Sequence, residues 1–98
     1  MTDQELLKLA AKAAGINIAQ GSRIAIDGKL WNPLTDDGDA LRLAVKLGIH
    51  QMHSKHKVKA GRKLVEDGPC EEDKIPDPYA ATRRAIVRAA AEIGKVMS

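Results

Sequence analysis

The sequence predicts an α+β fold in which helices cover a small antiparallel or mixed sheet, in the order helix, two strands, helix, two strands, helix. Three segments repeat apolar residues with a helical period, and each begins at a capping residue. Between them lie two segments of alternating or β-branched residues. A chain of 98 residues has room for one modest core, so we expect a single domain over residues 1–98.

The first part of the chain is expected to form a helix and then a hairpin. A T-x-x-E capping box begins at Thr2, which predicts a helix over residues 3–14. The dipeptide Asp27-Gly28 is a strong two-residue turn between β-branched residues. We therefore expect a β-hairpin over residues 22–32.

The second helix is expected over residues 36–47. Either Thr35 or Asp36 is its N-cap, and Gly48 is its C-terminal stop. Its expected apolar face consists of Ala40, Leu41, Ala44, Val45 and Leu47.

The last part of the chain is expected to form a β segment over residues 49–66, an acidic loop over 67–76 and a helix over 78–96. Asp77 and Pro78 are suitable as the N-cap and first residue of that helix. Helical spacing predicts a buried stripe made of Tyr79, Thr82, Ile86, Ala89, Ala90, Ile93 and Met97.

The composition predicts an aliphatic core, because the chain has no phenylalanine and only one tryptophan and one tyrosine. Cys70 is the single cysteine, so an intramolecular disulfide is excluded and a reducing compartment is expected. No apolar run has the length needed to span a bilayer. We therefore expect a cytoplasmic protein that is not bound to a membrane.

Three carboxylates cluster where the second helix begins, at Asp36, Asp37 and Asp39. Acids in a first helical turn complement the helix dipole, which makes capping the favoured interpretation and ligand contact the alternative. The run lacks the alternating oxygen ligands and distant glutamate of a calcium loop. Neither a metal nor another cofactor is expected.

A ligand seat is the sharper interpretation of the same region. Trp31 and Asn32 precede the acids, and Arg83 lies at the core boundary of the last helix, from which it can reach one of the three aspartates. An arginine beside a tryptophan would bind an anion or a nucleobase. Arg84 and Arg88 lie opposite the apolar stripe and are expected in solvent.

A basic patch in the second β segment contains Lys55, Lys57, Lys59, Arg62 and Lys63. It could bind a polyanion or a partner, but it contains no aromatic residue for stacking on bases, so nucleic acid is disfavoured. A solubilising edge strand is the alternative. His50, His53 and His56 are spaced by three, which in a strand does not bring them to one metal.

Catalysis is not expected, because no serine or cysteine lies in a nucleophile motif. Cys70 falls in the expected acidic loop, where neighbouring carboxylates would raise the pKa of its thiol.

Two blocks resemble a known family, residues 32–48 (NPLTDDGDALRLAVKLG) and 79–94 (YAATRRAIVRAAAEIG). They are similar to the small bacteriophage and prophage proteins grouped as the phage ABA-sandwich domain. The resemblance implies an α-β-α sandwich and a phage or prophage origin, with no established activity for the family as a whole.

With that resemblance, we expect a non-catalytic accessory protein in the cytoplasm of a bacterial host, which binds a host or defence protein as a counter-defence inhibitor. The alternative is sequestration of a nucleotide-like anion at the Trp31 and Arg83 seat. A metal-dependent hydrolase using Asp36 and Asp39 ranks lowest. The alanine-rich last helix and the sparse aromatic residues are compatible with a homodimer, but the sequence does not determine the oligomeric state.

Overall fold

Residues 2–16, 25–26, 29–61 and 70–97 are described by the computed structural model of this chain. In chain order the elements are α1 (Asp3–Ala14), β1 (Ala25–Ile26), β2 (Lys29–Leu30), α2 (Asp37–Leu47), β3 (His50–His53), β4 (Lys57–Gly61), β5 (Cys70–Asp73) and α3 (Pro78–Val96). The α+β class is confirmed. None of the described helices combines the length and the apolar character that a membrane span requires.

Local capping explains where the helices begin and end. Thr2 accepts a hydrogen bond from the backbone N–H of Glu5 (3.2 Å) at the start of α1. Asp36 and Asp77 are the N-caps of α2 and α3. Gly48 ends α2 with φ of 67°, in the left-handed region that glycine enters most readily. These predicted helix ends are confirmed.

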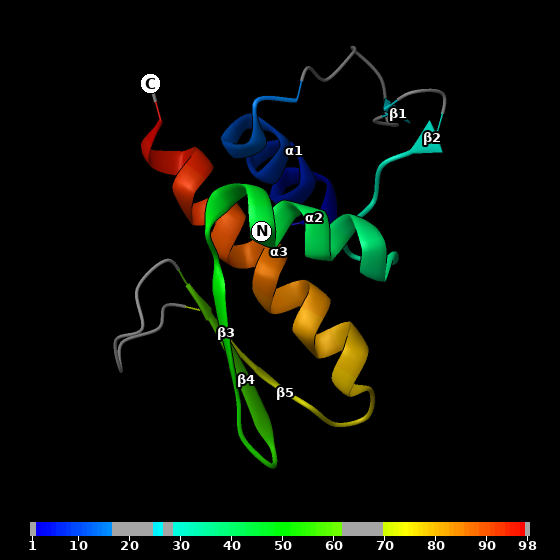
Figure 1. The fold of residues 1–98 in the computed structure, drawn as a ribbon, viewed down its shortest axis with the longest axis vertical. Coiled ribbons are helices and arrows are strands. Elements are labelled where there is room, and N and C mark those ends of the chain that lie inside the picture. Colours follow the sequence, from blue (N-terminus) through cyan, green and yellow to red (C-terminus); the bar gives the residue numbers. More distant parts are fainter. Residues whose placement is uncertain (1, 17–24, 27–28, 62–69, 98) are drawn as a thin grey trace.

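Helix α3 occupies the centre of the described structure (Figure 1). It packs along α1 and against α2, and it also contacts β4 and β5 of the three-stranded sheet. An α-β-α sandwich would instead place a sheet between layers of helices. Here a helix lies between the sheet and the other two helices, so the sandwich order is not confirmed by the described residues.

The three-stranded sheet is antiparallel, with the order β3-β4-β5. The expected acidic loop over 67–76 is wrong for residues 70–73, because they form β5. Lys57 of β4 lies opposite Asp73, and Lys59 lies opposite Glu71. Opposite charges across two strands stabilise a pairing that the low intrinsic β propensity of acidic residues does not predict.

The predicted hairpin is confirmed only around its turn. Ala25 pairs with Leu30, and Ile26 pairs with Lys29. The second strand ends at Leu30, so the predicted extension to residue 32 is wrong; residues 22–24 and 27–28 lie outside the described residues. Pro33, which follows closely and is fully buried, has no N–H to continue a ladder.

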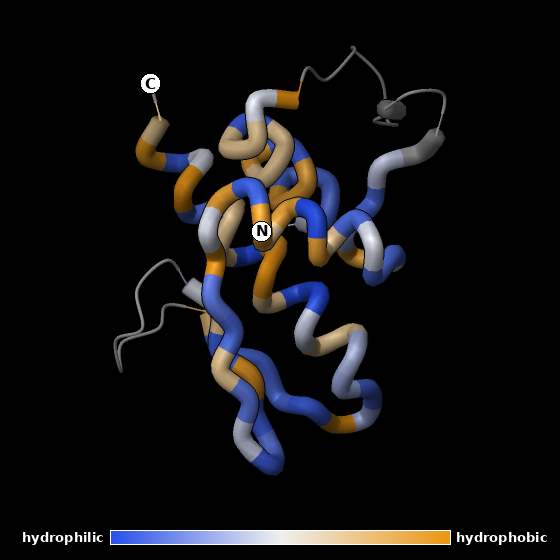
Figure 2. The backbone as a smooth tube through the Cα atoms, in the orientation of Figure 1, coloured by the Kyte–Doolittle hydropathy of each residue, from blue (hydrophilic) through white to orange (hydrophobic). Residues whose placement is uncertain are grey.

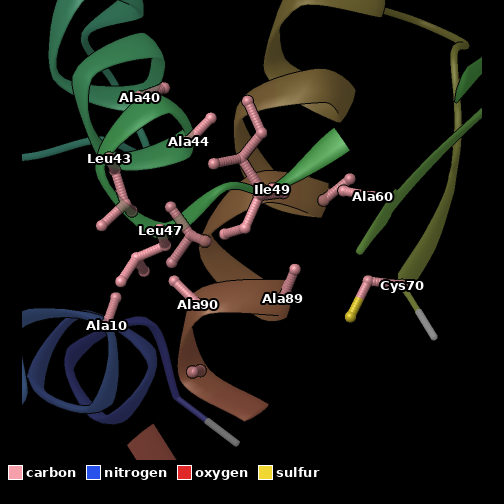
Figure 3. Close-up of a cluster of buried hydrophobic side chains, with 14 of the residues drawn as sticks. Ala10, Ala40, Leu43, Ala44, Leu47, Ile49, Ala60, Cys70, Ala89 and Ala90 are labelled. Carbon is pink, nitrogen blue, oxygen red and sulfur yellow. The ribbon is translucent and has the colours of Figure 1, made fainter. Parts of the chain in front are cut away.

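The core is aliphatic, as the composition predicts, and small residues let the elements approach closely. Figure 3 shows Leu43 and Leu47 of α2 beside Ala10 of α1 and Ala90 of α3. The closest approach is at Gly94 of α3, where a Cβ atom would lie 2.1 Å from the carbonyl oxygen of Leu9. This position therefore accepts only glycine without a shift of backbone.

Two predicted apolar faces are wrong in part. Leu41 and Val45 of α2 are exposed, and Leu43, outside the predicted face, is buried. On α3, Tyr79 and Met97 are exposed. Because α3 has neighbours on several sides, its buried residues surround much of the helix: Ala81, Ala85, Ile86, Val87, Ala89, Ala90, Ala91 and Gly94.

The arginines expected in solvent form ion pairs instead. Arg84 Nη1 lies 3.0 Å from Asp3 Oδ1 of α1. Arg88 Nη1 donates to the carboxylate of Glu72 and, at 3.1 Å, to the carbonyl oxygen of Glu71 in β5. The polar side of α3 faces acids on α1 and β5, which the pattern of one helix cannot show.

Candidate functional site

The turn before α2 is held by side chains that the sequence predicts as a ligand seat. Asp36 accepts from the backbone N–H of Asp39 (2.7 Å), and the Asp39 carboxylate accepts from the backbone N–H of Asn32 (3.0 Å). The side-chain oxygen of Asn32 accepts in turn from the N–H of Leu34 (3.0 Å). Asn32, Asp36 and Asp39 therefore lie together, and each uses a side-chain oxygen to hold the turn.

Arg83 joins α3 to the same turn. Its Nε donates to the carbonyl oxygen of Leu34 (2.9 Å), and its Nη1 donates to Asp37 Oδ1 (2.6 Å). The expectation that Arg83 reaches one of the three aspartates is confirmed for Asp37. Asp39 forms its own ion pair with Arg42, at 2.7 Å. With only 18% of its side chain exposed, Arg83 has a clear structural role.

Trp31 is part of the apolar core rather than of this set of polar contacts. Only 8% of the residue is exposed, and it belongs to the buried apolar cluster. An indole buried in this way has little face free for stacking on a ligand. The structure therefore brings Asn32 and the three aspartates together with Arg83, but it places Trp31 in the core.

A groove of about 470 Å³ opens between α2, β3 and the first half of α3. Its apolar lining includes Leu41 of α2, which is 59% exposed, Tyr79 of α3, which is 70% exposed, and the buried Ile86. Its polar lining includes Asp37, Gln51, His53, Lys74 and Arg83. The groove thus combines two large exposed apolar side chains with several convergent polar ones.

Leu41 and Tyr79 are the two large exposed residues of the groove, although helical spacing predicts that both are buried. A signal was available for Leu41: apolar residues cover a wider arc of α2 than one packing stripe can bury. Because Ala40, Leu43, Ala44 and Leu47 face inward, Leu41 is left in solvent. No comparable signal marks Tyr79, whose exposure depends on where the neighbouring elements end.

The basic patch is only partly described. Lys55 lies between β3 and β4, at the hairpin end that Figure 2 shows in hydrophilic colours. Lys57 Nζ lies 2.8 Å from Glu71 Oε1, and this hydrogen bond raises the pKa of Lys57 and lowers the pKa of Glu71. Lys59 is half-buried on the same strand. Arg62 and Lys63 lie outside the described residues.

Neither a metal site nor a reactive thiol is supported among the described residues. Among the described residues, no group of three or more His, Cys, Asp or Glu is placed to hold a metal ion. Cys70 lies in β5 rather than in a loop, and only 2% of it is exposed. The pKa of its thiol is raised, as predicted, but burial is the largest cause.

No family model, curated protein or solved structure matches this chain. The likeness of residues 32–48 and 79–94 to the phage ABA-sandwich domain stays a prediction from the sequence.

Proposed function

We propose that this chain acts without catalysis, by binding another protein through the groove between α2, β3 and α3. The observation that carries the proposal is the exposure of Leu41 and Tyr79 within that groove. Large apolar side chains that gather in a concave surface, with polar groups around them, are typical of contact surfaces.

The energetics favour an apolar anchor from a partner. Burying one Leu-sized side chain contributes about 1.5 to 3 kcal/mol, and contacts centred on a few such anchors dominate most protein interfaces. Tyr79 adds a rigid ring with a polar hydroxyl, a type of residue enriched at such centres. One partner anchor inserted between Leu41 and Tyr79 would cover both.

The other functions considered from the sequence have less support. A nucleotide seat at Trp31 and Arg83 would need an accessible indole, yet Trp31 is buried. A hydrolase would need free carboxylates at Asp36 and Asp39. Both already accept hydrogen bonds from backbone N–H groups, and Asp39 also pairs with Arg42. Binding of a host or defence protein, in keeping with the phage resemblance, is the function that we favour.

Affinity capture with matched variants tests this function. Tagged wild-type protein is compared with Leu41→Ser, and with Val96→Ser as a control. Val96 is 84% exposed at the far end of α3, so it presents a similar exposed side chain away from the groove. Circular dichroism would check that all three proteins fold alike.

We expect wild-type protein and Val96→Ser to retain the same partner from bacterial lysate, and Leu41→Ser to lose it. Retention of that partner by Leu41→Ser at wild-type yield would show that the groove is not the contact surface. A wild-type protein that retains nothing beyond the untagged background would also count against the proposal.

A further inference from the structure

One side of the groove is the outer edge of a β-sheet. In the described part of the chain, β3 forms one edge of the three-stranded sheet and β5 forms the other. Gln51 and His53 of β3 line the groove. In the sheet they lie opposite Ala60 and Val58 of β4. The sheet edge and the apolar groove are therefore parts of one surface.

The two edges differ in their protection against a further strand. Charged side chains on an edge strand discourage pairing with another chain. In β5, Glu71, Glu72 and Asp73 supply three consecutive carboxylates. In β3, the sequence His-Gln-Met-His contains no lysine, carboxylate or proline. The edge beside the groove is thus the one suited to accept a strand.

A strand added to β3 would also reach the groove with its side chains. Alternate residues of a strand point to one face and are about 7 Å apart. On a strand paired with β3, the residues on the face of Gln51 and His53 would point toward Leu41 and Tyr79. Backbone hydrogen bonds would supply affinity, and apolar side chains at alternate positions would supply specificity.

The charges at one end of the groove determine which strand fits. Lys74 lines the groove, and Lys55 lies on the adjoining turn; neither forms an ion pair with a described residue. The backbone N–H of Lys74 donates to the carbonyl oxygen of His56 (2.8 Å), which holds Lys74 beside the β3–β4 turn. The acid that lines the groove, Asp37, is paired with Arg83. Lys55 and Lys74 are therefore two cations at this end of the groove that a partner's carboxylates can pair with.

We infer that the groove takes an extended segment of the partner, with apolar residues at alternate positions and an acidic end over Lys74, which pairs with β3 as a fourth strand. This inference rests on the proposed function, because it names the occupant of the same groove. It differs from that function in specifying the conformation and the charge of the occupant.

Selection from a library of random twelve-residue peptides by mRNA display tests the inference. Peptides recovered on the wild-type protein are measured by fluorescence anisotropy on three variants. Leu41→Ser removes an apolar wall, and Lys74→Glu reverses the charge at the turn. Lys8→Glu is the control, because it makes the same change in net charge on an exposed position of α1.

We expect recovered peptides to carry apolar residues at i and i+2 and acids at one end. Both groove variants should weaken binding by about tenfold or more, with Lys8→Glu close to the wild-type protein. Methylation of alternate backbone nitrogens of the peptide should abolish binding, because those amides would donate to β3.

Three results would overturn the inference: no enriched peptide, apolar residues at the i, i+3, i+4 spacing of a helix, or full tolerance of N-methylation at every position. Equal binding of the peptides to the wild-type protein and to Lys74→Glu would overturn the inference that the occupant has an acidic end over Lys74. Where peptides are recovered and Leu41→Ser still weakens their binding, only the strand inference fails; where no peptide is enriched, the affinity capture with Leu41→Ser decides whether the groove is the contact surface. If Leu41→Ser binds as the wild-type protein does, the proposed use of the groove fails with it.

Discussion

Replacing Gly94 with alanine tests the closest contact between two helices of this protein. A Cβ atom at Gly94 would lie 2.1 Å from the carbonyl oxygen of Leu9 and 2.9 Å from its carbonyl carbon. A Cβ atom essentially never approaches closer than 3.0 Å, so the oxygen must retreat by about 0.9 Å. Because these atoms belong to the backbone of α1, no side-chain rotation can relieve the overlap.

The loss of stability in Gly94→Ala is the difference between two opposing effects. Adding a methyl group to a packed site costs about 1 to 3 kcal/mol, and a rigid backbone obstacle belongs at the upper end of that range. Alanine recovers about 1 kcal/mol through its higher helix propensity. We therefore expect the free energy of unfolding to fall by about 2 kcal/mol. At roughly 4 to 8 °C per kcal/mol, the Tm should fall by about 8 to 16 °C.

Thermal unfolding followed by circular dichroism and by Trp31 fluorescence measures the change. Gly38→Ala is the matched control, since Gly38 also lies within a helix, α2. There a Cβ atom would meet side-chain atoms of Arg42 and Asp36 at 3.2 Å, so a shift of a few tenths of an ångström by these side chains is enough. Gly38→Ala should therefore lower the Tm much less than Gly94→Ala does. A Gly94→Ala protein as stable as the wild-type protein would refute the close packing of α1 on α3.

Substitutions at three further positions test individual side chains. Asp77→Ala removes the acceptor for the backbone N–H groups of Tyr79 (2.9 Å) and Ala80 (3.2 Å). The free energy of unfolding, measured in urea, should therefore fall by about 1 kcal/mol. An unchanged free energy would contradict the role of Asp77 as the N-cap of α3. Asp39→Ala should cost about 1 to 2 kcal/mol because it leaves the half-buried N–H of Asn32 without its acceptor, and Asp39→Asn should recover part of that loss. Cys70 tests pH dependence: burial raises the pKa of its thiol, so the folded state keeps a proton that the unfolded state releases above about pH 9. The free energy of unfolding should therefore be unaffected by this group at lower pH and should fall as the pH rises beyond that value, with a smaller decline in Cys70→Ala.

The ends of the helices could be predicted from the sequence because each depends on a few neighbouring residues. Asp36 and Asp77 accept from N–H groups two or three residues ahead, and Gly48 adopts its conformation through its own missing side chain. The Arg83 contact was predictable in part, since helical phase places Arg83 at the core boundary. Only the packing of α3 beside α2 selects Asp37 among three candidate acids.

The third strand and the groove could not be predicted in the same way. Residues 71–73 are acidic and have low β propensity, and they form β5 together with Cys70 because Lys57 and Lys59 lie across from Asp73 and Glu71. Leu41 and Tyr79 lie on the sides of their helices where helical spacing predicts burial. Their exposure follows from the positions of α1, α2 and the sheet around α3.

By itself, the sequence determined the α+β class, the ends of the three helices and the aliphatic core, because capping, turn chemistry and composition act over short stretches of chain. The tertiary structure alone decided the central place of α3, the ion pairs of Arg84 and Arg88, and the groove beside the open edge of β3. The physical reason is that a side chain is buried, paired or exposed according to its neighbours in space, which here come from distant parts of the chain.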